Sequence, residues 1–205
     1  MASNLASRRF KKAIRRKAQV AEKRRLEQLE GTLPAQVRRA LAAPIRHCLL
    51  QDSLFEQGIG TLIVARGVTT DQFALGSFLL DVYCLGIKDA MFRSVGAEEL
   101  AYYLDTMAAG SPLTPVDPPY ARKLLRDLAA WAGAIGFAPH PDFAAVEHVL
   151  ADVSAEACDV VFQFGRDGKP CYLPGPSESA SLIRRRLEQL RERLGEDGFD
   201  FMVAA

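Results

Sequence analysis

Two carboxylates and a lysine lie close together where a strongly apolar run ends. Asp81 interrupts the run over residues 73–84, and Lys88 and Asp89 follow it. Ends of central strands often carry functional side chains, and this set could hold Mg²⁺ and a phosphate group, as a nuclease requires. His140 and Asp142 add groups that transfer protons or bind metals. These five residues are the catalytic candidates of a metal-dependent nuclease or other phosphoester hydrolase, with Mg²⁺ as its cofactor.

The same residues also have an interpretation that needs no ligand, and we favour it. A carboxylate buried in an apolar strand must be paired or hydrogen-bonded, and Arg66 or Lys88 could pair with Asp81. Asp89 would then be an acidic residue at the start of a helix. Whether the protein is an enzyme therefore stays open at this stage.

The histidine and cysteine patterns point to no specific chemistry. His140, Asp142 and His148 match no metal-ligand spacing, and Asp142 suits the N-cap of a following helix, so no metal site is predicted. Cys84 faces the other side of its strand from Asp81, and a catalytic thiolate needs a base or a positive environment. The four cysteines are widely spaced without any C-x-x-C pair, which is typical of reduced thiols in a cytoplasmic protein.

The N-terminus is strongly basic, whereas the rest of the chain is acidic. Residues 1–25 contain ten basic side chains and one acidic one, and the remainder contains 16 basic and 24 acidic side chains. Residues 4–30 lack Pro and Gly and predict one long helix with a thin apolar stripe. A polyanion would relieve the repulsion along this helix and release its own counterions. We therefore predict a nucleic-acid-associated protein that binds RNA or a ribosome through Arg8, Arg9, Lys11, Lys12, Arg15, Arg16, Lys17, Lys23, Arg24 and Arg25.

Other partners for this basic segment remain open. It could fold back on the acidic body, or dock on an acidic protein and make the chain an adaptor. The apolar stripe, with Phe10 and Ile14 as its only large residues, is too thin to insert well into a bilayer. No apolar run is long enough for a transmembrane segment, and no secretory signal is visible, so a cytoplasmic location is expected.

The remaining pattern predicts a basic arm over residues 1–31 and a single α+β domain over residues 32–205. Two short helices separated by Pro44 are expected over residues 32–52. A hairpin is expected from residues 61–65 and 72–85, and a second from residues 160–164 and 171–173 around Asp167 and Gly168. Helices are expected over 88–93, 97–108, 120–136, 143–150 and 177–194, and a last strand over 199–203. Together these elements indicate a mostly antiparallel sheet built from two hairpins and packed by several helices.

Three segments of the chain resemble a family of uncharacterised bacterial proteins. They are residues 78–89 (FLLDVYCLGIKD), 136–143 (GFAPHPDF) and 164–170 (FGRDGKP), and the likeness extends over about residues 55–203. The resemblance brings no activity and no functional residues with it. It implies that the three segments come together around one feature of the fold.

Overall fold

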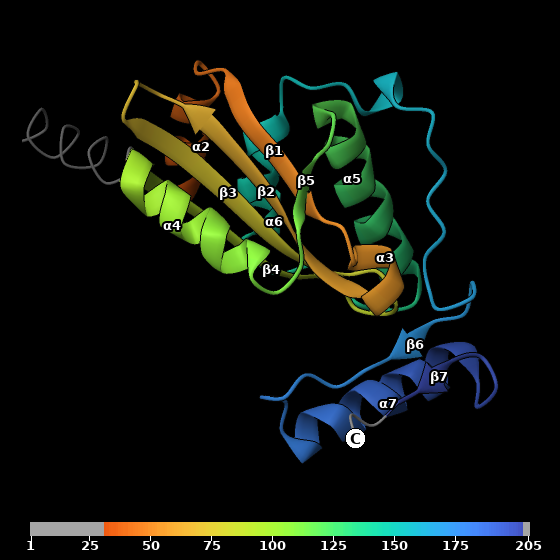
Figure 1. The fold of residues 1–205 in the computed structure, drawn as a ribbon. Coiled ribbons are helices and arrows are strands. Elements are labelled where there is room, and N and C mark those ends of the chain that lie inside the picture. The colour runs from red at the N-terminus through yellow and green to blue at the C-terminus, as the bar shows by residue number, and fades with distance from the viewer. Residues whose placement is uncertain (1–30, 203–205) are drawn as a thin grey trace, which may run out of the picture.

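The computed structural model describes residues 31–202, and the helix predicted over residues 4–30 lies outside the described residues. A five-stranded antiparallel sheet in the order β4-β3-β2-β1-β5 forms the centre of the fold (Figure 1). The α+β class predicted from the sequence is confirmed. The strands are β1 (Ile45–Gln51), β2 (Ile59–Gly67), β3 (Gln72–Asp81), β4 (Gly86–Gly96) and β5 (Leu113–Pro115).

Helices cover both faces of this sheet (Figure 1). On β2, Leu62 and Val64 belong to the core on one face, whereas Ile63 and Ala65 belong to the core on the other. This alternation buries the central strand on both sides, as the two-residue period of a strand requires. The first face packs against α2 (Leu33–Ala40), α5 (Pro118–Ala134), α6 (Phe143–Val146) and the 3-10 turn η1 (Glu147–Leu150), and the second against α4 (Ala97–Ala108).

Two segments predicted as helices are strands. Residues 45–51 form β1 and residues 88–93 lie within β4, which pairs with β3 along its whole length. Gly86 starts β4 with φ +74°, and a Cβ there would lie 2.5 Å from Cβ of Ala132. This tight turn brings β4 back beside β3, and the backbone pairing that follows overrides the helical preference of its residues.

The C-terminal part of the chain forms a small layer below the sheet (Figure 1). Strand β6 (Cys171–Tyr172) pairs in parallel with β7 (Asp200–Phe201), and Tyr172 shares an apolar cluster with Phe199 and with Leu190 of α7 (Ala180–Leu194). The predicted hairpin with residues 160–164 is wrong, because this segment forms no strand. Its Phe162 and Phe164 pack against other aromatic rings. The predicted turn within it is present, with Arg166 bridged to Lys169 and positive φ at Asp167 and Gly168.

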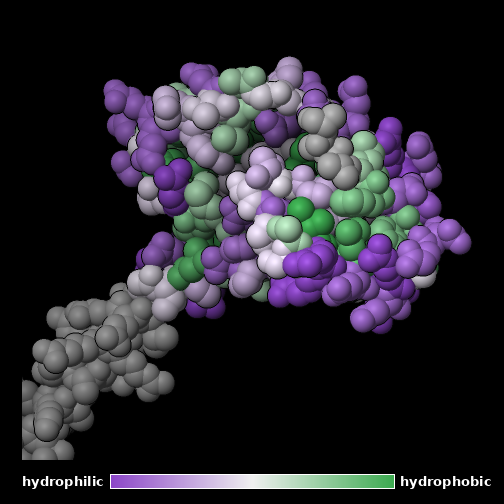
Figure 2. Space-filling model, turned by 90° about the horizontal axis from the view of Figure 1, so that it is seen from below, coloured by the Kyte–Doolittle hydropathy of each residue, from purple (hydrophilic) through white to green (hydrophobic). Residues whose placement is uncertain are grey.

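The surface seen from below gathers apolar residues in its right half, bordered by hydrophilic ones (Figure 2). Phe201 and Met202 of the C-terminal layer are among the exposed apolar side chains. Within residues 31–202, no helix combines the length and the apolar character needed to cross a membrane.

Two further short helices complete the described chain. The four-residue helix α3 (Leu54–Gln57) joins β1 to β2, and the 3-10 turn η2 (Ala155–Ala157) precedes the extended segment that leads to β6.

Candidate functional site

The catalytic candidates Asp81, Lys88 and Asp89, predicted from the sequence, lie at or next to the turn from β3 into β4. A pocket of about 250 Å³ opens beside it, lined by Leu85, Ile87, Lys88, residues 137–141 and Arg186. The segment after residue 164 packs on the same turn, since the Gly165 N–H donates to the Val82 carbonyl at 2.8 Å and the Cys171 N–H to that of Tyr83 at 2.9 Å. Residues 137–141 adjoin the same turn, since the His140 N–H donates to the Ile87 carbonyl at 2.9 Å.

Asp81 is directed into the turn that follows β3. Its side chain is buried and accepts hydrogen bonds from the backbone N–H groups of Tyr83 at 3.1 Å and Cys84 at 2.8 Å. Burial raises the pKa of Asp81, while these hydrogen bonds and the charge of Lys88 act in the opposite direction. The carboxylate thus satisfies a turn whose N–H groups would otherwise be buried without partners.

Arg66 does not pair with Asp81, contrary to one sequence hypothesis. It is 1% exposed and donates from Nε to the Val149 carbonyl at 2.7 Å and from Nη1 to the Ala43 carbonyl at 2.6 Å. Its Nη2 pairs with Asp152. The residue lies at the other end of β2, beside Ala74, because Asp81 pairs with Ile59. Arg66 therefore fastens β2 to two neighbouring loops and takes no part in the turn.

Lys88 belongs to a charge network that joins β4 to the C-terminal layer. Its Nζ lies 3.4 Å from Oε1 of Glu178, and Nη1 of Arg186 lies 2.5 Å from Oε2. The latter contact is ionic, because Nη1 forms no aligned hydrogen bond with any described residue. The Tyr172 hydroxyl donates to Glu178 at 2.5 Å, and the Arg186 guanidinium lies 5.8 Å from the centre of the Tyr172 ring.

The pKa shifts of Glu178 and Tyr172 indicate that this network holds the C-terminal layer in place. Burial would raise the pKa of Glu178, but Tyr172 and the Arg186 guanidinium hold it below its ordinary value. Burial and the hydrogen bond to Glu178 raise the pKa of Tyr172 to about 12. Two cations thus share one ionised carboxylate, so the network fixes the C-terminal layer to the sheet.

The remaining candidates flank the same pocket. Nε2 of His140 lies 3.6 Å from Oδ1 of Asp89, and Nδ1 accepts a hydrogen bond from the Asp142 N–H at 3.3 Å, so Nε2 carries the ring proton. Asp142 holds the predicted N-cap position of α6, but its side chain makes no capping hydrogen bond. His148 is elsewhere, with Nδ1 2.7 Å from the Ala144 carbonyl.

These positions provide no catalytic metal centre or thiolate in the part of the chain that the structure describes. Lys88, Asp89 and His140 lie together, but no three His, Cys, Asp or Glu side chains of residues 31–202 are arranged to hold a metal ion. Cys84 is buried, and burial followed by the charge of Asp81 raises its pKa far above the ordinary value. The thiol therefore stays protonated and is a poor nucleophile.

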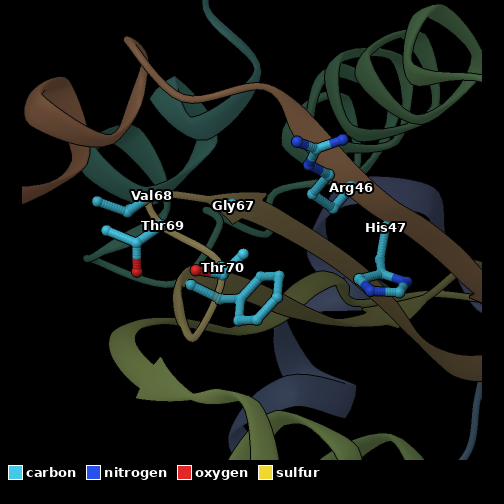
Figure 3. A pocket seen from close by; sticks show the side chains of 7 residues that line it. Arg46, His47, Gly67, Val68, Thr69 and Thr70 are labelled. Carbon is cyan, nitrogen blue, oxygen red and sulfur yellow. The ribbon is translucent and has the colours of Figure 1, made fainter.

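A larger pocket lies at the opposite end of the sheet, beside the β2–β3 hairpin (Figure 3). Its volume is about 580 Å³. Arg46 and His47 reach it from adjoining positions of β1, across from the hairpin residues (Figure 3). Ile45 pairs with Arg66 and His47 pairs with Ala65, so Arg46 is the extra residue of a β-bulge. The pocket is lined by Arg46, His47, Gly67, Val68, Thr69, Thr70 and Phe73.

Three exposed arginines near this hairpin end have no acidic partner among residues 31–202, unlike the buried Arg66, which pairs with Asp152. Arg46 is exposed and forms no ion pair there, and the same holds for Arg38 and Arg39 in the last turn of α2. A second pocket of about 390 Å³, which Arg39 lines, shares Val68 with the first. Sequence reasoning missed these arginines, because only the folded chain brings α2, β1 and the hairpin together.

Glu178 balances Lys88 and Arg186 beside the β3–β4 turn, the turn end of the sheet, whereas Arg38, Arg39 and Arg46 near the hairpin make no ion pair within residues 31–202. Arg184 and Arg185 on α7 likewise make no ion pair within residues 31–202, so what distinguishes Arg38, Arg39 and Arg46 is their position around α2 and the hairpin-end pockets. No protein-family model matches the chain, and comparison with curated proteins and with solved structures gives no match. Function is therefore inferred from the charge and geometry of this chain alone.

Proposed function

We propose that the protein binds RNA without catalysing a reaction, using its basic N-terminal segment together with the hairpin end of the sheet. One observation carries the proposal. The end of the domain at which the first described helix, α2, follows the ten basic residues of the N-terminal segment carries three arginines without an ion pair to any of residues 31–202, namely Arg38, Arg39 and Arg46. Positive charge from both parts would therefore act on one polyanion.

The position of these arginines disfavours docking of the segment on its own domain. Residues 31–202 carry 16 basic and 22 acidic side chains, so the domain as a whole would attract the segment. The surface nearest the junction presents arginines, however, and like charges at short range repel. An external polyanion removes that repulsion, which supports RNA over self-docking.

The binding proposed here is electrostatic and tolerant of sequence. Lysine and arginine side chains bind phosphates and release condensed counterions, a gain that is independent of base identity. A ribosome is the RNA-rich partner that we favour, which would give the protein a cytoplasmic location. In this proposal the buried networks at the turn end serve the stability of the domain.

Affinity purification of the full chain from cells, with and without RNase, tests the proposal. We expect RNA to copurify and to be lost when Arg8, Arg9, Arg15 and Arg16 are all replaced by Gln. Replacement of Arg184 and Arg185, two exposed arginines of α7, by Gln is the control and leaves the RNA bound.

Two results would overturn the proposal. Wild-type protein free of nucleic acid would contradict it outright. Protein partners that survive RNase and are lost with the N-terminal arginines would identify an adaptor for an acidic protein.

A further inference from the structure

We infer that the hairpin-end pocket holds one nucleotide unit, a nucleoside 5′-monophosphate, with its phosphate on Arg46 and its base against His47 and Phe73. The inference deepens the proposed function and rests on it only for RNA as the source of the nucleotide. The seven lining residues supply a cation, two rings and two hydroxyl groups within one pocket.

Arg46 is positioned to receive the phosphate. The β-bulge adds this residue between two paired positions of β1, and bulges characteristically redirect a side chain. Its stem runs alongside Gly67, where a Cβ would lie only 2.8 Å from Cγ of Arg46. With no carboxylate partner among residues 31–202, its guanidinium keeps its N–H donors for a phosphate, to which it can bind in bidentate fashion.

Two aromatic rings form the wall for the base. The centres of the His47 and Phe73 rings lie 6.3 Å apart with an angle of 51° between their planes. Unpaired bases stack on such side chains, and stacking tolerates any base because each has an aromatic face. The pocket should therefore select for a nucleotide without reading its identity.

The hairpin supplies hydroxyl groups for the sugar and phosphate oxygens. Oγ1 of Thr69 accepts a hydrogen bond from the Asp71 N–H at 3.3 Å, which leaves its own proton to donate. Thr70 lines the same pocket (Figure 3). Asp71 is the one carboxylate of the hairpin turn over residues 68–71, and it does not line the pocket.

The pocket also has a suitable size and access. About 580 Å³ falls within the range of roughly 300–1,000 Å³ common to small-molecule sites. Arg46 and Val68 are exposed at its border, so a strand of RNA could enter and leave on either side of the bound unit. The turn-end pocket is less suited, because its volume is about 250 Å³ and Glu178 already engages Lys88 and Arg186.

The three histidines of the chain give a direct test by NMR. Adenosine 5′-monophosphate is titrated into the full chain at constant pH while the ring signals of His47, His140 and His148 are followed. We expect saturable shifts at His47 alone, because His140 lines the other pocket and His148 lines neither. Equal shifts at all three histidines, or none at His47, would overturn the inference.

Variants link the shifts to the proposed contacts. Arg46→Gln should weaken binding by about tenfold, since a charged hydrogen-bond donor is removed. Arg185→Gln has the same change of charge on exposed α7 and should leave the affinity unchanged. Unaltered binding by Arg46→Gln would contradict the assignment, and because Arg46 is exposed the variant is expected to fold.

A competition arm separates this inference from the proposed function. Single-stranded RNA added to the complex should displace the mononucleotide and reverse the His47 shifts. If the mononucleotide binds at His47 but RNA neither displaces it nor binds the protein, the pocket stands and the proposed function fails. If RNA binds while His47 never responds to the mononucleotide, the proposed function stands and the pocket assignment fails.

Discussion

At the scale of single residues, the two buried charges of the sheet are satisfied mainly by backbone groups. Arg66 donates to carbonyls of Val149, Ala43 and Leu41 and pairs with Asp152, while Asp81 accepts two N–H groups of its own turn. Sequence reasoning required Asp81 to be paired or hydrogen-bonded, but it named only Arg66 and Lys88 as its possible partners. Backbone groups are equally good partners, and the fold decides which of them come within reach.

Replacing Arg66 with Met should destabilise the protein strongly. The variant leaves three carbonyls without their donor and removes the ion pair with the half-exposed Asp152, so we expect a loss of about 3 kcal/mol or more of unfolding free energy, at about 1–3 kcal/mol for each buried carbonyl left unpaired. Urea denaturation of the full chain measures this. Arg46→Met, at an exposed position, is the control and should change the unfolding free energy by less than about 0.5 kcal/mol. Equal losses in the two variants would contradict the role assigned to Arg66.

Because its pKa is raised, Asp81 should make the unfolding free energy depend on pH at values above those at which an aspartate usually titrates. Burial raises its pKa in the folded state, so above the unfolded value of about 3.9 the folded chain binds more protons than the unfolded chain. The contribution of Asp81 to unfolding free energy therefore falls as pH rises toward the folded pKa.

The Asp81→Asn variant isolates this contribution. Its oxygen can still accept the Tyr83 and Cys84 N–H groups, but it does not titrate. Between pH 4 and pH 8, its stability relative to the wild type should rise with pH in urea denaturation. Asp159→Asn, with the same change of side chain at an exposed position, is the control variant. A pH-independent difference for Asp81→Asn would contradict the shift.

At the scale of elements, the sequence predicts best where the local pattern and the tertiary environment agree. Helices α4, α5 and α7 and the β2–β3 hairpin match their predicted positions closely, because a helical stripe or a strand run there coincides with the buried face. β1 and β4 were predicted as helices, since their stabilising contacts come from partner strands distant in sequence. Of the catalytic candidates, Lys88 and His140 line one pocket, and Asp89 lies beside His140. The hairpin-end pocket could not be predicted, because it forms only when β1 pairs with the distant strand β2.

A substitution at Gly58 measures how closely the end of α3 packs against Tyr83 in the β3–β4 turn. Gly58 has φ +79°, and a Cβ on it would overlap the ring of Tyr83. Gly58→Ala should lose about 1 kcal/mol through the left-handed backbone and about 1–3 kcal/mol more through the clash. Gly168→Ala has a similar φ of +82° with open space around it, so it should show the backbone cost alone. Thermal or urea unfolding compares the two, and equal losses would argue against the packing described.

At the scale of the whole molecule, the uneven distribution of charge is the dominant feature. A strongly basic N-terminal segment precedes a domain with an excess of acidic residues, and three arginines that make no ion pair within residues 31–202 lie at the hairpin end. The charge of the segment was evident from composition. The positive charge of Arg38, Arg39 and Arg46 on the folded domain was not evident from the sequence. These arginines form no pattern there and come together only when α2, β1 and the hairpin are assembled.

The salt dependence of binding to a single-stranded RNA tests the central claim most directly. In a plot of log affinity against log salt concentration, each phosphate that the protein neutralises adds about −0.7 to the slope. Arg15→Gln/Arg16→Gln should weaken binding and make the slope shallower by about 0.7 for each phosphate that is no longer neutralised. The matched pair Arg184→Gln/Arg185→Gln should bind as the wild type does. Wild-type affinity that is independent of salt, or equal losses from both pairs, would contradict RNA binding through the basic N-terminal segment.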